Sequence, residues 1–161
     1  MRKTVSIAAG IAAAATIAFV AASCGSSTAP GLKRYVANLS PANEVPAKTT
    51  TGTGVVTFVD NGTSIDWTMT LTNMINVAAS HIHGPAVAGV NAGVMIFLFT
   101  PITPTGTLNG VVSKGSITAS SNVGVSLDSL RVLFNNGNAY VNVHTAVNPG
   151  GEIRDQVHPV P

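Results

Sequence analysis

The chain has 161 residues, of which eight are Lys or Arg and six are Asp or Glu, and it contains four histidines and one cysteine. The basic residues do not form the cluster that a nucleic-acid surface requires, so this class of partner is excluded. A single cysteine rules out an intrachain disulfide, and the length suits one domain built around one hydrophobic core.

Residues 1–23 have the pattern of a secretory signal peptide. Arg2 and Lys3 form a positively charged start, an alanine-rich apolar stretch follows, and small residues lead directly to Cys24. A lone thiol in an exported protein calls for an explanation, and lipidation of Cys24 at a lipobox supplies one. The alternatives are cleavage by an ordinary signal peptidase and an uncleaved anchor. The weak hydrophobicity of the alanine-rich stretch argues against the uncleaved anchor.

The segment after the signal is expected to hold a domain at a membrane. Residues 24–32 have the composition of a flexible tether, and Gly25 stands where an aspartate is associated with inner-membrane retention in Gram-negative cells. We therefore expect an exported protein that is lipid-anchored through Cys24 at the outer membrane or cell surface. Because Arg2 and Lys3 belong to the signal, the remaining chain has six basic and six acidic residues and no net charge.

Residues 33–161 are expected to form one all-β domain, because Thr, Val, Gly and Asn are common and Lys and Glu are rare. A first strand is predicted over residues 33–39. A hairpin is predicted next, with strands over 55–60 and 63–71. Its connection is predicted to be a two-residue type I′ turn at Asn61-Gly62, since both central positions of that turn need positive φ.

The register of the predicted hairpin follows from its turn. Counting outward pairs Phe58 with Ile65 and Val56 with Trp67. The apolar residues of both strands then lie on one face and the polar residues on the other.

The rest of the domain alternates short strands with turn signals. The further predicted elements are strands over 77–83 and 93–99, a bent strand or strand pair over 108–120, a helix capped by Ser126 and ended by Asn136-Gly137, a strand over 139–145, a tight turn over 147–151 and a last strand over 152–157. The run VMIFLF is continuously apolar and is predicted to be a central strand. Leu127, Leu130 and Phe134 share a face of the helix. We therefore predict a Greek-key β-sandwich or flattened barrel with one short accessory helix.

Three of the four histidines lie in two strand-like motifs. His81 and His83 are two residues apart, so they project from one face of their strand while Ile82 points inward. In the strand over 139–145 the same alternation turns His144 outward, together with Tyr140 and Asn142. If these strands are neighbours, three imidazoles converge and could bind one copper or zinc ion. The alternative is a polar outer face that only fixes the adjacent Gly84-Pro85 turn.

Other polar residues near these motifs have two readings. Glu152 and Arg154 share a face and could orient a histidine, as could Tyr140 and Asn142. Alternatively, Glu152 and Arg154 form a solvated ion pair at a sheet edge, which contributes little to stability. For Arg154 this second interpretation is preferred. His158 lies in a proline-rich tail and is expected to be solvated.

Nucleophilic catalysis finds little support in the sequence. The chain has no Gly-X-Ser-X-Gly elbow and no phosphate-binding glycine loop. Its six acidic residues are scattered along the chain, so paired carboxylates are not indicated. No catalytic residue is assigned, and a hydrolase is not expected.

The same motifs resemble the CHRD domain, a module named after chordin that is widespread in bacterial secreted proteins. The matching segments are residues 43–46 (NEVP), 81–84 (HIHG) with the glycine-rich loop that follows, 137–145 (GNAYVNVHT) and 148–154 (NPGGEIR). The resemblance covers about residues 35–157. It implies an immunoglobulin-like or superoxide-dismutase-like β-sandwich, with a molecular role in bacteria that is mostly undefined.

The His81-Ile82-His83 segment is also similar to the copper-binding His-X-His strand of Cu/Zn superoxide dismutases, by analogy of fold and motif. A two-metal dismutase site draws on more than the four histidines of this chain, and the dismutase disulfide cannot form with one cysteine. The resemblance thus leaves room for a single copper or zinc ion only.

Two hypotheses about function follow. The first is a surface-tethered binding or structural module whose outer face engages an envelope or extracellular protein. The second is a metal-binding lipoprotein that uses His81, His83 and His144 for copper handling or for protection against oxidants. Because ligand imidazoles must be neutral and their unperturbed pKa is about 6.5, metal affinity is expected to fall below about pH 6.

Overall fold

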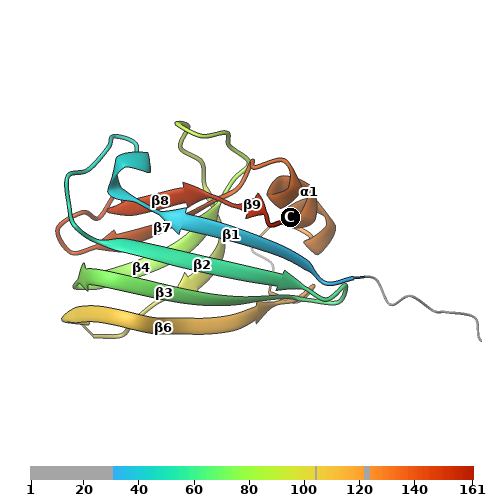
Figure 1. Ribbon diagram of the computed structural model, residues 1–161, viewed down its shortest axis with the longest axis horizontal. Coiled ribbons are helices and arrows are strands. Elements are labelled where there is room, and N and C mark those ends of the chain that lie inside the picture. The colour runs from blue at the N-terminus through green and yellow to red at the C-terminus, as the bar shows by residue number, and fades with distance from the viewer. Residues whose placement is uncertain (1–30, 104, 122–123) are drawn as a thin grey trace, which may run out of the picture.

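The computed structural model describes residues 31–103, 105–121 and 124–161. These residues form two antiparallel β-sheets packed face to face, with one short α-helix at an end of the sandwich (Figure 1). The predicted signal peptide, Cys24 and the tether up to residue 30 lie outside the described residues. The all-β sandwich predicted from the sequence is confirmed.

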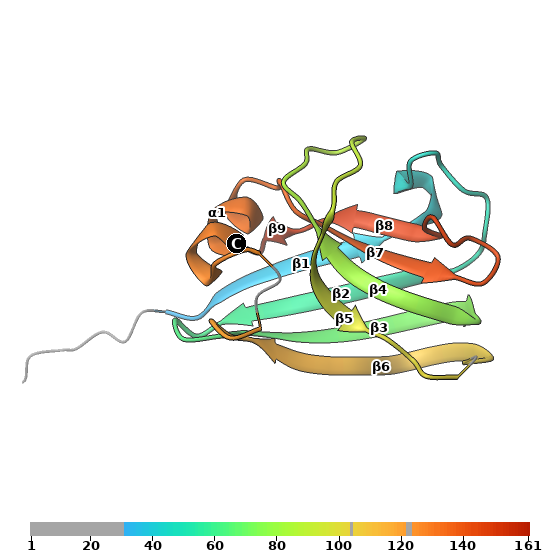
Figure 2. The same cartoon turned by 180° about the vertical axis from the view of Figure 1, so that it is seen from behind.

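The strands pair both with sequence neighbours and, in β1–β9, β3–β6 and β4–β7, with strands distant in sequence. In chain order they are β1 (Lys33–Leu39), β2 (Thr53–Asp60), β3 (Ile65–Ile75), β4 (Val77–His83), β5 (Val94–Phe99), β6 (Thr107–Ile117), β7 (Tyr140–Thr145), β8 (Ile153–Gln156) and β9 (His158–Pro159). The 3-10 helix η1 (Pro41–Asn43) follows β1, and α1 (Leu127–Asn135) lies between β6 and β7. One sheet has the order β6-β3-β2-β1-β9. The smaller sheet has the order β5-β4-β7-β8, and Figure 2 shows it in front.

Strand alternation explains why each sheet buries one face. Val56 and Phe58 of β2 are fully buried, while the residues between and beside them are exposed or half-buried. From the opposite sheet, Ile82, Val141 and Val143 are also fully buried. The two inner faces therefore share one hydrophobic core, and burying a side chain such as Phe58 contributes about 1.5–3 kcal/mol.

Helix α1 covers one end of this core. Its N-cap is Ser126, whose Oγ accepts a hydrogen bond from the Ser129 backbone N–H at 3.1 Å. Leu130 and Phe134 are buried, and the Phe134 ring centroid lies 5.0 Å from that of Phe58. The predicted helix is thus confirmed in its cap and in its apolar face. None of the helices within the described residues has the length and hydrophobicity of a membrane-spanning segment.

The β2–β3 hairpin forms, but its predicted register is wrong by two residues. Phe58 lies opposite Trp67, not Ile65, and Val56 lies opposite Met69. Because side chains alternate with a period of two, a shift by two residues keeps every side chain on its predicted face. The buried face was therefore predicted correctly although the pairing was not.

The register differs from the prediction because the loop of the hairpin is longer and spans residues 61–64. The Asn61 side chain accepts hydrogen bonds from the backbone N–H groups of Thr63 and Ser64, at 3.0 and 2.9 Å. Gly62 has a φ of +92°, but Asn61 does not have positive φ, so the type I′ turn does not form. Side-chain to backbone bonding of this kind favours the longer turn.

Strand β5 is an edge strand, which corrects the prediction that the apolar run VMIFLF is central. It pairs with β4 alone in its sheet. Met95, Ile96 and Leu98 are buried, but Phe97 is 56% exposed. Phe97 is an apolar residue on the outer face of the sheet, where its ring meets the ring of His81.

Two further predictions are refined by the structure. Residues 107–117 form one strand, β6, whose register shifts twice along β3, and not a strand pair. The predicted last strand over 152–157 corresponds to β8, in the smaller sheet, but it is not the last, because the chain then crosses to the larger sheet. There β9 pairs with β1, with His158 opposite Val36.

Asp60 and Arg131 connect the larger sheet to α1. The buried Asp60 carboxylate accepts hydrogen bonds from Arg131 Nε at 2.8 Å and Nη2 at 2.9 Å. These bonds hold the pKa of Asp60 below its usual value of 3.8. We therefore predict that Asp60→Ala lowers the free energy of unfolding by about 1–3 kcal/mol near neutral pH.

The pH dependence of this effect has a defined sign. A lowered carboxyl pKa gives stability that is complete above the unfolded value and is lost as pH falls through the folded value. The difference between wild type and Asp60→Ala should shrink in denaturant titrations as pH falls below the unfolded value of 3.8. Asp128→Ala is the control, because its carboxylate is 91% exposed although it lies 2.7 Å from Arg131 Nη1. Asp128→Ala should lower the free energy of unfolding by no more than about 0.5 kcal/mol. An equal decrease in the two variants would contradict the prediction.

Candidate metal centre

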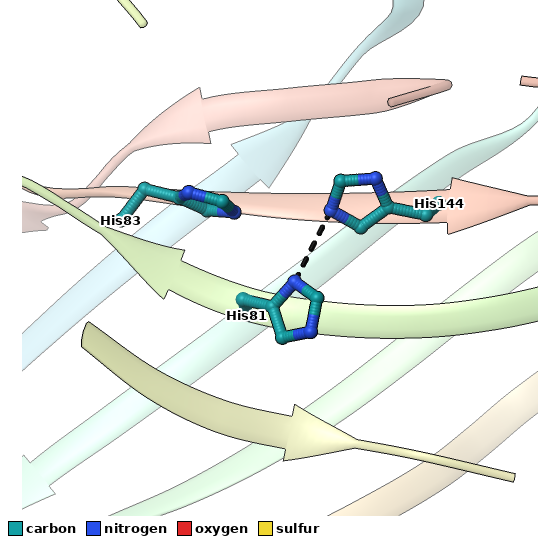
Figure 3. A group of neighbouring side chains, drawn as sticks. All are labelled: His81, His83 and His144. Carbon is teal, nitrogen blue, oxygen red and sulfur yellow. Dashed lines mark hydrogen bonds between the residues drawn. The ribbon is translucent and has the colours of Figure 1, made fainter. Parts of the chain in front are cut away.

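Antiparallel pairing of β4 with β7 places three histidines together. Ile82 lies opposite Val141 and both point into the core, so their neighbours point outward. His81 and His83 come from β4 and His144 from β7, and Figure 3 shows the three rings gathered on the outer face of these strands. One potential ligand atom from each ring lies within 4.8 Å of the other two.

Backbone carbonyls fix two of the rings. The Nδ1 of His83 lies 3.0 Å from the Ala92 carbonyl oxygen, and the Nδ1 of His144 lies 2.9 Å from the Pro149 carbonyl oxygen. A carbonyl only accepts, so each Nδ1 carries a proton and donates it. The Nε2 atom of each neutral ring then carries the lone pair.

These Nε2 lone pairs are turned toward the cluster. His144 Nε2 accepts a hydrogen bond from His81 Nδ1 at 3.2 Å, the contact drawn in Figure 3. His83 Nε2 is buried and has no hydrogen-bond partner among the described residues. Holding Nδ1 by a backbone carbonyl and leaving Nε2 free is the arrangement by which proteins orient metal-binding histidines.

Burial favours the neutral form of all three imidazoles. Burial lowers the pKa of His81 to about 4, with a smaller contribution from the neighbouring His144 and His83. Burial likewise lowers the pKa values of His83 and His144, against the raising effect of their hydrogen bonds to backbone carbonyls. Protons therefore compete for these ligands at a lower pH than for free imidazole, so the onset of acid release is expected below the value of about 6 inferred from the sequence.

Aromatic rings enclose the histidines on two sides. The Phe97 ring meets the His81 ring edge-on, with centroids 4.8 Å apart. The Tyr140 ring is stacked on the His83 ring at 4.9 Å and nearly parallel to it. The Tyr140 hydroxyl accepts a hydrogen bond from the Ala92 N–H at 3.1 Å. Tyr140 thus holds both the His83 ring and the backbone segment that orients it.

Arg154 is buried, which overturns its interpretation as part of a solvated ion pair. It is 1% exposed, and its guanidinium lies 3.7 Å from the Tyr140 ring centroid. It donates hydrogen bonds to Asn91 Oδ1 and the Val90 carbonyl, both at 2.8 Å. The burial arises because the loop between β4 and β5 folds over β8, a tertiary contact that strand periodicity does not reveal. Arg154 thereby fixes the loop that carries Ala92.

Glu152 acts on the turn between β7 and β8 and not directly on an imidazole. It accepts hydrogen bonds from Thr145 Oγ1 at 2.5 Å and Asn148 Nδ2 at 3.1 Å. These bonds brace the turn over residues 147–151, whose Pro149 carbonyl orients His144. Its contribution to the cluster is therefore through this turn.

Glu44 is a polar residue that the sequence reasoning did not assign to the site. It is buried, it accepts a hydrogen bond from Asn142 Nδ2 at 2.8 Å, and burial raises its pKa. A Cβ at position 151 would lie 2.7 Å from its Oε1, so Gly151, with φ +130°, is required for the close packing. The one available signal was the match of residues 43–46 to the CHRD pattern.

His158 does not belong to the cluster. It is exposed on β9, and its ring lies near Gly137. The structure therefore brings together three of the four histidines, as the spacing of the motifs predicts, and leaves the fourth apart.

Fold and site together define the class of protein: a two-sheet β-sandwich that carries a histidine cluster on the outer face of its smaller sheet. Residues 35–157 match the family model of the CHRD domain. The chain therefore belongs to the CHRD domain family, in agreement with its sequence motifs. CHRD domains are in general non-enzymatic, and the match indicates an extracellular binding or structural module. Comparisons with curated proteins and with solved structures find no match.

The lowered histidine pKa values predict how stability depends on pH. A histidine whose pKa is lower in the folded state binds fewer protons there than in the unfolded chain. Stability should be complete above about pH 6.5 and should fall as pH drops below it. NMR titration of the metal-free protein should show the His81 ring neutral at pH 5, consistent with its pKa of about 4. A His81 midpoint near 6.5 would contradict the prediction.

Proposed function

We propose that this protein is a lipid-anchored module of the cell envelope whose CHRD domain binds a single copper or zinc ion through His81, His83 and His144. The observation that carries the proposal is the convergence of three imidazoles, two of them already oriented by backbone carbonyls so that Nε2 carries the lone pair. Imidazole nitrogen suits both metals. Bound copper would supply one-electron chemistry, and bound zinc would supply a Lewis acid.

Burial of the ligands supports this function over a purely solvated histidine cluster. His83 is 8% exposed and its Nε2 has no partner within the described part of the chain. A buried acceptor without a partner is costly, and a bound cation removes the cost. Loop contacts made by Arg154 and Glu152 hold the two orienting carbonyls in place, which favours a preformed site.

A second candidate function is protection against oxidants by a copper-loaded domain. It is favoured by the accessibility of the cluster, because His81 and His144 are only half-buried. A small solute could then reach an ion held between them. Faster consumption of added superoxide in the presence of the copper-loaded protein, but not of the zinc-loaded protein, would support this second function.

Metal binding is tested by calorimetric titration of the purified full chain in detergent with Cu(II) and Zn(II). We expect about one ion per chain, and we expect a loss of at least about 100-fold in affinity in the His81→Ala/His83→Ala/His144→Ala variant, since three ligands define the site. His158→Ala is the matched control and should bind as the wild type does, because His158 lies apart from the cluster.

The outcome that contradicts the proposal is weak binding of equal strength in the wild type and the triple variant. The histidines would then serve only to hold the loops that carry Ala92 and Pro149. The search for function would turn to envelope or extracellular protein partners.

Anchoring is tested by Cys24→Ser. Without the thiol no lipid can be attached, so the variant should be recovered in soluble form, while the wild type is recovered with membranes and incorporates labelled palmitate. Membrane recovery of both proteins, without label in either, would contradict lipid anchoring and favour an uncleaved signal.

A further inference from the structure

A second buried acceptor without a partner lies beside the histidines. Asn142 is 4% exposed, and its Oδ1 makes no hydrogen bond within the described residues. It lies on β7 directly opposite His81 and two residues before His144, so all three share the outer face. His83 is its diagonal neighbour across the strand pair. Such pairs lie within reach of each other's side chains.

The Asn142 amide is held in one orientation. Its Nδ2 donates to Glu44 Oε1 at 2.8 Å, and an ionised carboxylate can only accept, so nitrogen and not oxygen faces Glu44. Gly151 packs against the same atoms, because a Cβ there would lie 2.6 Å from Asn142 Nδ2. The carbonyl oxygen therefore occupies the other side of the amide, away from Glu44.

Two neighbouring groups thus offer lone pairs and lack a donor. They are His83 Nε2 and Asn142 Oδ1, both buried. Neither can satisfy the other, because both are acceptors when His83 Nδ1 carries the ring proton. A cation placed between them satisfies both atoms at once.

We propose that Asn142 Oδ1 is the fourth protein ligand of the metal, which makes the site three nitrogens and one oxygen, and that Glu44 positions it. This inference rests on the proposed metal site. An amide oxygen is a hard ligand that suits divalent ions and contributes little to Cu(I). The site therefore takes Zn(II) or Cu(II) in preference to Cu(I).

The test compares Zn(II) affinity and the Cu(II) electron paramagnetic resonance spectrum of the full chain in detergent. Asn142→Leu removes the oxygen at nearly constant size. It should weaken Zn(II) binding by about 10- to 100-fold and change the g and copper hyperfine values, while the nitrogen couplings of the imidazoles remain. His158→Ala is the control, because His158 is exposed on β9, apart from the cluster; it should bind Zn(II) as the wild type does.

Asn142→Asp serves where the leucine variant fails to fold. It keeps an oxygen at the same place but replaces the Nδ2 donor by an acceptor, so it is combined with Glu44→Gln, whose amide can donate to it. The copper spectrum should then shift and Zn(II) binding should tighten. Wild-type spectra in both folded variants, with wild-type Zn(II) affinity in Asn142→Leu, would overturn the ligand role while leaving the three-histidine site intact. Failure of the wild type to bind either ion would overturn both proposals.

Discussion

Antiparallel pairing of β4 with β7 is the constraint on which the candidate site depends. Ile82 and Val141 lie opposite each other and are fully buried, so their strands are fixed in register by the core. A slip of one residue would expose these apolar side chains and turn the histidines inward. The same hydrophobic burial that stabilises the sandwich therefore fixes the positions of His81, His83 and His144. Stability of the fold and geometry of the site have one physical origin.

A polar layer lies outside the smaller sheet and is closed by three loops. The loop between β4 and β5 contributes the Ala92 carbonyl, the turn between β7 and β8 contributes the Pro149 carbonyl, and the segment after η1 contributes Glu44. Arg154 connects this layer to the first of these loops, and stacks on Tyr140. A guanidinium and a carboxylate are costly to bury unless their hydrogen bonds are satisfied. Their burial here indicates that the layer is a built feature and not an ordinary solvated sheet face.

Neutral ligands distinguish this site from one made of carboxylates. Imidazoles that are desolvated and crowded by each other resist protonation, as the lowered pKa of His81 shows. Crowding of neutral rings costs less than crowding of charges, so the cluster can exist before an ion binds. The fourth histidine, His158, lies apart from the cluster, and the Asn142 amide oxygen is a buried acceptor without a partner beside His81 and His144.

The local sequence pattern by itself determined much of the structure of this protein. Period-two alternation predicts the all-β fold, the buried face of each strand and the outward direction of the three histidines, because side-chain direction in a strand depends only on neighbouring residues. It failed where the outcome depends on contacts distant in sequence. The hairpin register followed the Asn61 side chain, β5 became an edge strand, and Arg154 was buried under a loop. Only the tertiary structure decided that β4 and β7 are neighbours and that Glu44, about 100 residues away in sequence, fixes the Asn142 amide, because burial and hydrogen-bond partners are properties of the packed chain and not of its local order.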